Sequence, residues 1–137
     1  MVKIVVPMIA ALLMSRAAFA QTCLHPSSGE TAEQEARRRA ALAATRAINN
    51  IQFNRPEAPK VFLRHEELAS APFAAKLASA KSPIVLTPGQ DIVPGWRLKL
   101  DVLPSGYWFS ITDTTDPCHF SFISNNSGLI YTAEPLR

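Results

Sequence analysis

Hydrophobic and polar residues alternate strictly between residues 96 and 102. The two sets are Trp96, Leu98, Leu100 and Val102 against Arg97, Lys99 and Asp101. A period of two is the pattern of a β-strand with one face buried and the other in water. Pro104 and Gly106 then interrupt the alternation, as residues that favour turns. The segment therefore predicts a half-buried strand that enters a hairpin.

Three further segments follow this turn and are separated from one another by short polar stretches. They span residues 107–112, 118–124 and 129–132. In the first of them, Tyr107, Phe109 and Ile111 share one face and Trp108 lies on the other. Connections this short join antiparallel neighbours, because a parallel pair needs a crossover of about a dozen residues. The pattern predicts an antiparallel meander of about four strands, whose apolar face must be covered.

A helical period upstream predicts the element that covers this face. Small apolar residues recur at helical spacing: Ala36, Ala40, Ala43, Ala44, Ala47, Ile48 and Ile51. Ser27 and Glu30 have the spacing of a capping box, which places the helix at about 28–50. The fold class expected from the sequence is therefore α+β, with a long N-terminal helix packed on the antiparallel sheet.

The segment between helix and meander has weaker patterns. Residues 61–63 are either a short strand or an apolar plug. Pro72 divides residues 66–80 into two short helical pieces, because proline interrupts a helix. Residues 84–86 are expected to form one more strand, and residues 91–95 to link it to the meander.

The first 20 residues have the pattern of a secretory signal peptide. Lys3 precedes an apolar run over residues 4–14, and Ala18-Phe19-Ala20 fits a signal-peptidase cleavage pattern. The run is shorter than the roughly 20 apolar residues that span a bilayer, and Arg16 interrupts it. We expect cleavage after residue 20, no stable membrane anchor afterwards, and a periplasmic or secreted location.

Cleavage also changes the charge of the protein. It removes Lys3 and Arg16, which lowers the formal net charge from +3 to +1. A nearly neutral chain gives no electrostatic indication of a nucleic-acid partner. Residues 21–137 remain, and about 117 residues suit a single domain.

Cys23 and Cys118 are the two cysteines of the chain. In an exported protein an even number of cysteines indicates disulfides, and only one intramolecular pairing exists here. Free thiols or an intermolecular bridge are the alternatives. In the chain-entropy model, closing a loop of about 95 residues stabilises a fold by at most about 4 to 5 kcal/mol. That is comparable with the net stability of a small domain.

Three stretches together resemble a known family. They are the helix end at residues 47–52, the stretch at residues 63–68, and the closing hairpin at residues 120–131. In this order they resemble the globular part of type IV pilins and type II secretion pseudopilins, over roughly residues 36–133. The resemblance implies a helix packed on an antiparallel sheet and a role in a filament or secretion machine.

The chain departs from that family at its N-terminal end. Pilins continue their leader into an uninterrupted apolar helix, which packs in the filament core. Here the apolar run ends in a cleavage pattern, and residues 22–28 separate it from the helix. The sequence therefore predicts a pilin-like domain without the stem that filament assembly uses.

Residues with catalytic or ligand-binding chemistry form no recognised constellation. His25, His65 and His119 lack the spacing of a zinc motif, and the cysteines lack CxxC spacing. Cys118 and His119 are adjacent in a predicted strand, so they would point to opposite faces and would not act together. We expect no enzyme activity, no cofactor and no metal.

The turn between Asp113 and Asp116 leaves two interpretations open. Its carboxylates and hydroxyls have the oxygen ligands that calcium prefers. Aspartate at the start of a turn more commonly accepts hydrogen bonds from its own backbone.

Arg37, Arg38 and Trp108 are the candidate partner surface. The run Arg37-Arg38-Arg39 either contacts an anionic partner or pairs with Glu33 and Glu35 one turn earlier. Trp108 is the aromatic residue most expected to be exposed. A complete fold without catalytic groups predicts binding to another protein or structural assembly. The alternative is a small-ligand or inhibitor-like module of cystatin-like shape, with an apolar pocket bordered by Trp108.

Overall fold

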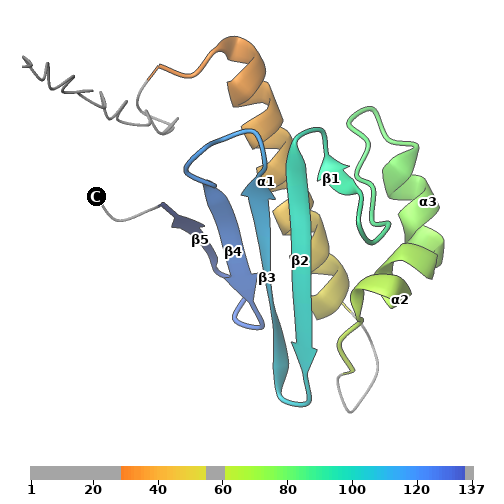
Figure 1. Cartoon of the computed structure of the whole chain (residues 1–137). Coiled ribbons are helices and arrows are strands. Elements are labelled where there is room, and N and C mark those ends of the chain that lie inside the picture. The colour runs from red at the N-terminus through yellow and green to blue at the C-terminus, as the bar shows by residue number, and fades with distance from the viewer. Residues whose placement is uncertain (1–28, 55–60, 135–137) are drawn as a thin grey trace, which may run out of the picture.

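A computed structural model of the chain describes residues 29–54 and 61–134. The predicted signal peptide, Cys23 and Ser27 lie outside the described residues. In the described residues one long helix packs on a five-stranded antiparallel sheet, and two short helices lie at the side of the sheet (Figure 1). The fold class is α+β.

The elements follow one another simply along the chain. The helices are α1 Ala32–Phe53, α2 His65–Ser70 and α3 Pro72–Ala78, and the strands are β1 Asp91–Val93, β2 Trp96–Leu103, β3 Gly106–Asp113, β4 Ser121–Asn125 and β5 Ile130–Ala133. The sheet order is β1-β2-β3-β4-β5, each strand antiparallel to the next. The predicted meander is confirmed, with five strands where we expected about four.

The additional strand is β1, which lies in the expected linker. Val93 pairs with Trp96 across a tight turn, in which Gly95 has a φ of +79°. Proline followed by glycine at positive φ is the sequence of a type II turn, and it reverses the chain here. Residues 84–86, expected as a strand, form none, although the Val85 N–H donates to the Ile92 carbonyl (2.9 Å).

Helix α1 begins later than the sequence predicted. Thr31 is the N-cap, and its hydroxyl accepts from the Gln34 N–H (3.2 Å) while the Gln34 side chain accepts from the Thr31 N–H (2.8 Å). Glu30 instead accepts from Arg38 Nε (3.0 Å). The predicted start was wrong because two consecutive segments, residues 27–30 and 31–34, fit the same capping-box pattern.

The inner face of the sheet is buried as the alternation predicted at Trp96 and Leu98, whereas Leu100 and Val102 are only partly buried. Its large side chains are Trp96, Leu98, Tyr107, Phe109, Ile111, Phe120 and Phe122. Trp96 stacks on Phe122 with ring centroids 5.6 Å apart, and Tyr107 stacks on Phe109 at 6.1 Å. Aromatic contacts of this kind add to the burial of apolar area.

The buried face of α1 differs from the predicted alanine face. Ala44 and Ile48 are buried, but Ala36 and Ala43 are exposed. Instead the helix buries three polar side chains, which are Thr45, Asn49 and Gln52. The predicted apolar face is confirmed in part, since Ala40, Ala47 and Ile51 also pack against the core. The three polar side chains were missed because buried polar residues are uncommon and apolar periodicity does not reveal them.

Asn49 is the centre of a hydrogen-bond network between α1 and the sheet. Its Nδ2 donates to Ser124 Oγ on β4 (2.8 Å) and to the Gly128 carbonyl (3.3 Å). Its Oδ1 accepts from the Tyr107 hydroxyl on β3 (3.0 Å). Ser124 Oγ donates to the Leu129 carbonyl (2.7 Å). Both amide atoms of Asn49 thus have partners, as burial of a polar group requires.

Gln52 lies one turn later on the same face and holds residues 61–64. Its Nε2 donates to the Leu63 carbonyl (2.8 Å), and its Oε1 accepts from the Leu63 N–H (2.9 Å). Phe62 packs on Tyr107 with ring centroids 5.0 Å apart. Residues 61–63 are no strand. Phe62 and Leu63 pack against the core as an apolar plug would, but Val61 is exposed.

Tyr107 makes stability depend on pH in the alkaline range. Burial raises its pKa from 10.0 to about 12. Between these values the folded state keeps the phenolic proton and the unfolded state loses it, so the free energy of unfolding falls as the pH rises. Below pH 10 the contribution of Tyr107 is constant. A shift of this size lowers the free energy of unfolding by about 2 to 3 kcal/mol over this pH range.

We expect the stability advantage of the wild type over Tyr107→Phe to shrink by this amount between pH 9 and pH 12. Urea unfolding of both proteins across the range measures it, and the titration of lysines cancels in the difference. A constant difference between the two proteins would contradict the shift.

Candidate functional site

One face of the sheet is left uncovered by the described helices and strands. α1 lies against the opposite face, as Figure 1 shows. We call the uncovered side the outer face. Its side chains come from alternate positions of β2 to β5: Arg97, Lys99, Asp101, Trp108, Ser110, Thr112, Ser121, Ile123, Asn125 and Tyr131.

Strand register places the larger apolar side chains of this face together. One cross-strand row runs Lys99–Ser110–Ile123–Tyr131, and the adjoining row contains Trp108. Trp108 is 37% exposed and Tyr131 is 51% exposed. Lys99 Nζ lies 5.3 Å from the centre of the Trp108 ring, within the range of a cation–π contact.

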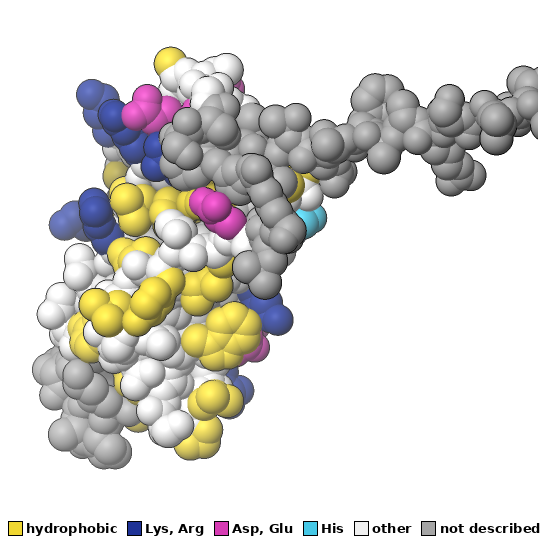
Figure 2. Space-filling model, turned by 90° about the vertical axis from the view of Figure 1, so that its left-hand side faces the viewer, with side chains coloured by type: hydrophobic (Ala, Val, Ile, Leu, Met, Phe, Trp, Pro, Cys, Tyr) yellow, Lys and Arg dark blue, Asp and Glu magenta, His cyan; other side chains and the backbone are white. Residues whose placement is uncertain are grey.

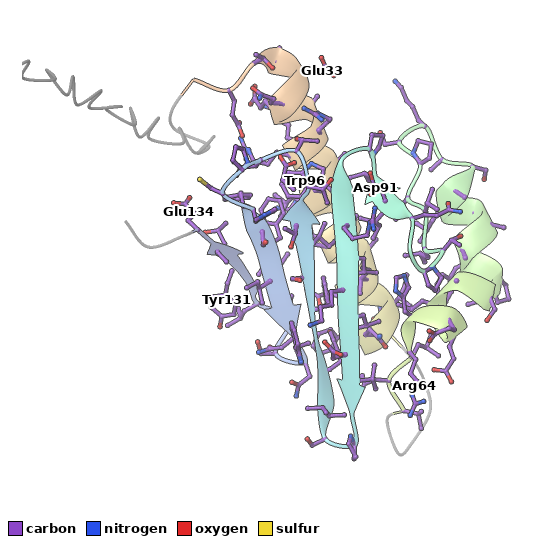
Figure 3. All side chains as sticks on the ribbon, in the orientation of Figure 1. Glu33, Arg64, Asp91, Trp96, Tyr131 and Glu134 are labelled. Atoms are coloured by element: carbon purple, nitrogen blue, oxygen red, sulfur yellow. The ribbon has the colours of Figure 1, made fainter. Side chains whose placement is uncertain are left out.

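β5 forms an edge of this sheet. It pairs with β4, and no described residue pairs with its other side. Figure 2 looks onto this edge and shows hydrophobic side chains gathered there, with basic side chains at the margins. Figure 3 shows Tyr131 on β5 at the same edge. An unpaired edge offers backbone N–H and C=O groups to another chain.

The structure does not bring Arg37 and Arg38 onto the outer face. Arg38 pairs with Glu30, and Arg39 pairs with Glu35 (2.6 Å). Of the two predicted pairings only the one with Glu35 is found among the described residues. The exposed pair of Arg39 and Glu35, one turn apart, fits the interpretation of a solvated helix face. Arg37 and Arg38 do not fit it, because both side chains are partly buried.

Arg37 lies at the far end of β2 from Trp108. Its Nη1 approaches Gly95 so closely that a Cβ there would lie 3.1 Å away, and its Nε is buried with no hydrogen-bond partner among the described residues. Trp108 pairs with Asp101, about 16 Å along β2 from Trp96. The predicted partner residues therefore lie in two separate places.

The aspartates of the turn before β4 bond their own backbone. Asp113 Oδ1 accepts from the N–H (2.8 Å) and the hydroxyl (2.7 Å) of Thr115. Asp116 is buried and accepts from the N–H groups of Cys118 (3.0 Å) and Phe120 (3.1 Å). Within residues 29–54 and 61–134, no group of three or more His, Cys, Asp or Glu has the geometry to hold a metal.

Cys118 and His119 precede the strand in which we placed them. β4 begins at Ser121, and His119 has a φ of +52°. The expected position was wrong because the Asp116 turn extends to His119, whose N–H donates to the Asp116 carbonyl (2.9 Å). Cys118 is not a free thiol. Since Cys23 lies outside the described residues, its pairing with Cys118 stays a prediction.

His65 begins α2 beside the middle of β2. It lines a small hollow with Lys99 and Asp101, among others. Burial lowers the pKa of His65 below 6.5, although Glu66 and the Leu86 backbone act in the opposite direction. The imidazole is therefore held neutral near pH 7.

Trp108 was predicted from the sequence as an exposed site residue, whereas Tyr131 and Lys99 were not. Trp108 stood out because it opposes two aromatic residues in a clear alternation. Ile130 and Tyr131 are both large and adjacent, so the short last segment did not indicate which of them faces outward.

Within the part of the chain that is described, no helix is long and apolar enough to cross a membrane. Comparison of the chain with protein-family models, with curated proteins and with solved structures gives no match. The resemblance to pilins therefore stays a hypothesis, and function must be argued from the surface itself.

A bridge between Cys23 and Cys118 predicts a specific pattern of stabilities. Cys23→Ser, Cys118→Ser and the double variant should lose the same free energy of unfolding, at most about 4 to 5 kcal/mol. Mass spectrometry of a non-reduced digest should show one peptide pair that contains both residues. Unequal losses in the single variants, or two thiols that react with a labelling reagent in the native protein, would exclude the bridge.

Proposed function

We propose that this protein is an exported domain that acts by binding another protein or by taking part in a protein assembly, without catalysis. The binding surface is the outer face beside β5. The observation that carries the proposal is that Trp108 and Tyr131 lie exposed in adjoining cross-strand rows, next to Ile123. Exposed apolar residues in one patch, rimmed by polar ones, are typical of protein-interaction sites.

The residue types of this patch suit a protein partner. Tryptophan and tyrosine are enriched among residues that contribute most to interface affinity. The contact with Lys99 restricts the motion of the Trp108 side chain before binding. Less conformational entropy is therefore lost when the complex forms. Ser110 and Asn125 surround the patch with groups that can hydrogen bond.

We further propose a pilin-like domain over residues 21–137, located in the periplasm or secreted and stapled by Cys23 and Cys118. Support for it comes from the order of layers, since a helix on one face of a sequential antiparallel sheet is what the family resemblance implies. In such a domain the helix covers one face of the sheet and leaves the other for neighbouring proteins.

The cystatin-like alternative required an apolar pocket bordered by Trp108. The two hollows beside β2 are lined by residues that include Lys99 and Asp101 in one and Val102 and Leu103 in the other, and Trp108 lines neither. This geometry favours a protein partner over a small ligand at the outer face.

A photoreactive phenylalanine analogue at position 131 should form a discrete adduct with one protein in the cells that export the domain. The matched control is the same analogue at Val61, which is 57% exposed and lies outside the outer face. Trp108→Ala should weaken binding of the identified partner about tenfold or more, because loss of an interface tryptophan costs upward of about 1 to 2 kcal/mol.

Val61→Ala should leave that affinity unchanged. Equal adducts from both positions, or equal affinities of the two alanine variants, would contradict the proposed surface.

A further inference from the structure

An apolar groove runs between α1 and the two short helices. It consists of two adjoining hollows of about 620 Å³ and about 540 Å³. Both are lined by Asn50, Ile51 and Phe73, so they join along the same side of α1. Hollows of this size are in the range of small-molecule sites. The groove belongs to the helical layer, whereas the proposed protein-binding surface belongs to the sheet.

The floor of the groove is apolar and only partly covered by the described residues. Ile51, Phe73 and Leu77 pack against the core and remain half-exposed. Ala47 and Ala80, which also line the groove, have side chains too short to fill it. An apolar ligand in this groove would therefore remove from water the area that these side chains leave open.

The charge on the lining of the groove is positive. Among the described residues that line the two hollows, Lys76 is the one titratable side chain, and it lies in the last turn of α3. Asn50 adds an uncharged amide to the rim. A cation beside an apolar channel is complementary to a ligand with one negative head group and one apolar chain.

We propose that this groove binds a single-chain anionic amphiphile of the alkyl carboxylate class. The carboxylate lies at Lys76, and the alkyl chain runs over Ile51, Phe73 and Leu77. The groove extends about 10 Å along the helix axis, from Ala47 on α1 to Asn54, the C-cap residue of α1. That length accommodates about eight methylene groups.

Titration of the purified full chain with alkyl carboxylates of increasing length, each below its micelle concentration, tests the proposal. Affinity should rise about two- to fourfold for each methylene up to about eight and then level off, since each buried methylene contributes a fixed free energy. Chemical-shift changes in NMR spectra should centre on Ile51, Phe73 and Leu77.

Charge provides the control within the ligand series. Alkyltrimethylammonium ions of the same length should bind at least about tenfold more weakly than the carboxylates, and Lys76→Glu should reverse that order. The matched variant is Lys81→Glu, because Lys81 is exposed but outside the lining. It should leave the preference for carboxylates unchanged.

Steric block provides a test that does not depend on charge. Ala80 is exposed, so Ala80→Trp should keep the fold, which circular dichroism verifies, while the indole fills the groove and abolishes binding.

Three results would overturn the proposal. They are affinities independent of chain length, equal effects of Lys76→Glu and Lys81→Glu, and no binding of any alkyl carboxylate at millimolar concentration. In the last case, binding of an amphipathic peptide to the same residues would assign the groove to a protein partner instead.

Discussion

The buried amide of Asn49 is the interaction on which the arrangement of the two layers depends. It connects α1 to Tyr107 on β3, to Ser124 on β4 and to Gly128 in the turn before β5. An apolar helix face tolerates rotation and sliding on a sheet, whereas an amide buried there is satisfied in one orientation only. Each partner left unpaired in the core costs about 1 to 3 kcal/mol. Many positions of the helix on the sheet would bury a similar apolar area, and the network selects one of them.

Both candidate sites follow from that position. Asn49 and Gln52 face the sheet and residues 61–64. Ile51 and Asn50 therefore face the other way, and they line the groove together with Phe73. Gln52 fixes the extended segment that leads into α2, so it also determines where the short helices lie. With α1 on the inner face, no described helix covers the outer face. One helix with a polar buried stripe thus sets the positions of both the outer face and the groove.

Sequence predicted the parts of this fold that follow a simple period. The alternation at residues 96–102 gave β2 and the burial of its inner face, and the same logic identified Trp108 as exposed. β1 was missed because three residues are too few to show a period. The role of Asn49 was missed because apolar periodicity carries no information on buried polar groups. The groove was also invisible, since it lies between α1 and residues 71–80, which are far apart in the sequence, and no local pattern specifies how they pack.

The most direct test is a double-mutant cycle on Asn49 and Ser124. The free energies of unfolding of Asn49→Ala, Ser124→Ala and the double variant, measured in urea, give the coupling between the two side chains. The account predicts a coupling of at least about 1 kcal/mol, against less than about 0.5 kcal/mol for the control pair of Asn49 and Ser110, which lie on opposite faces of the sheet. A coupling between Asn49 and Ser124 as small as that of the control pair would contradict the claim that this amide sets the helix on the sheet.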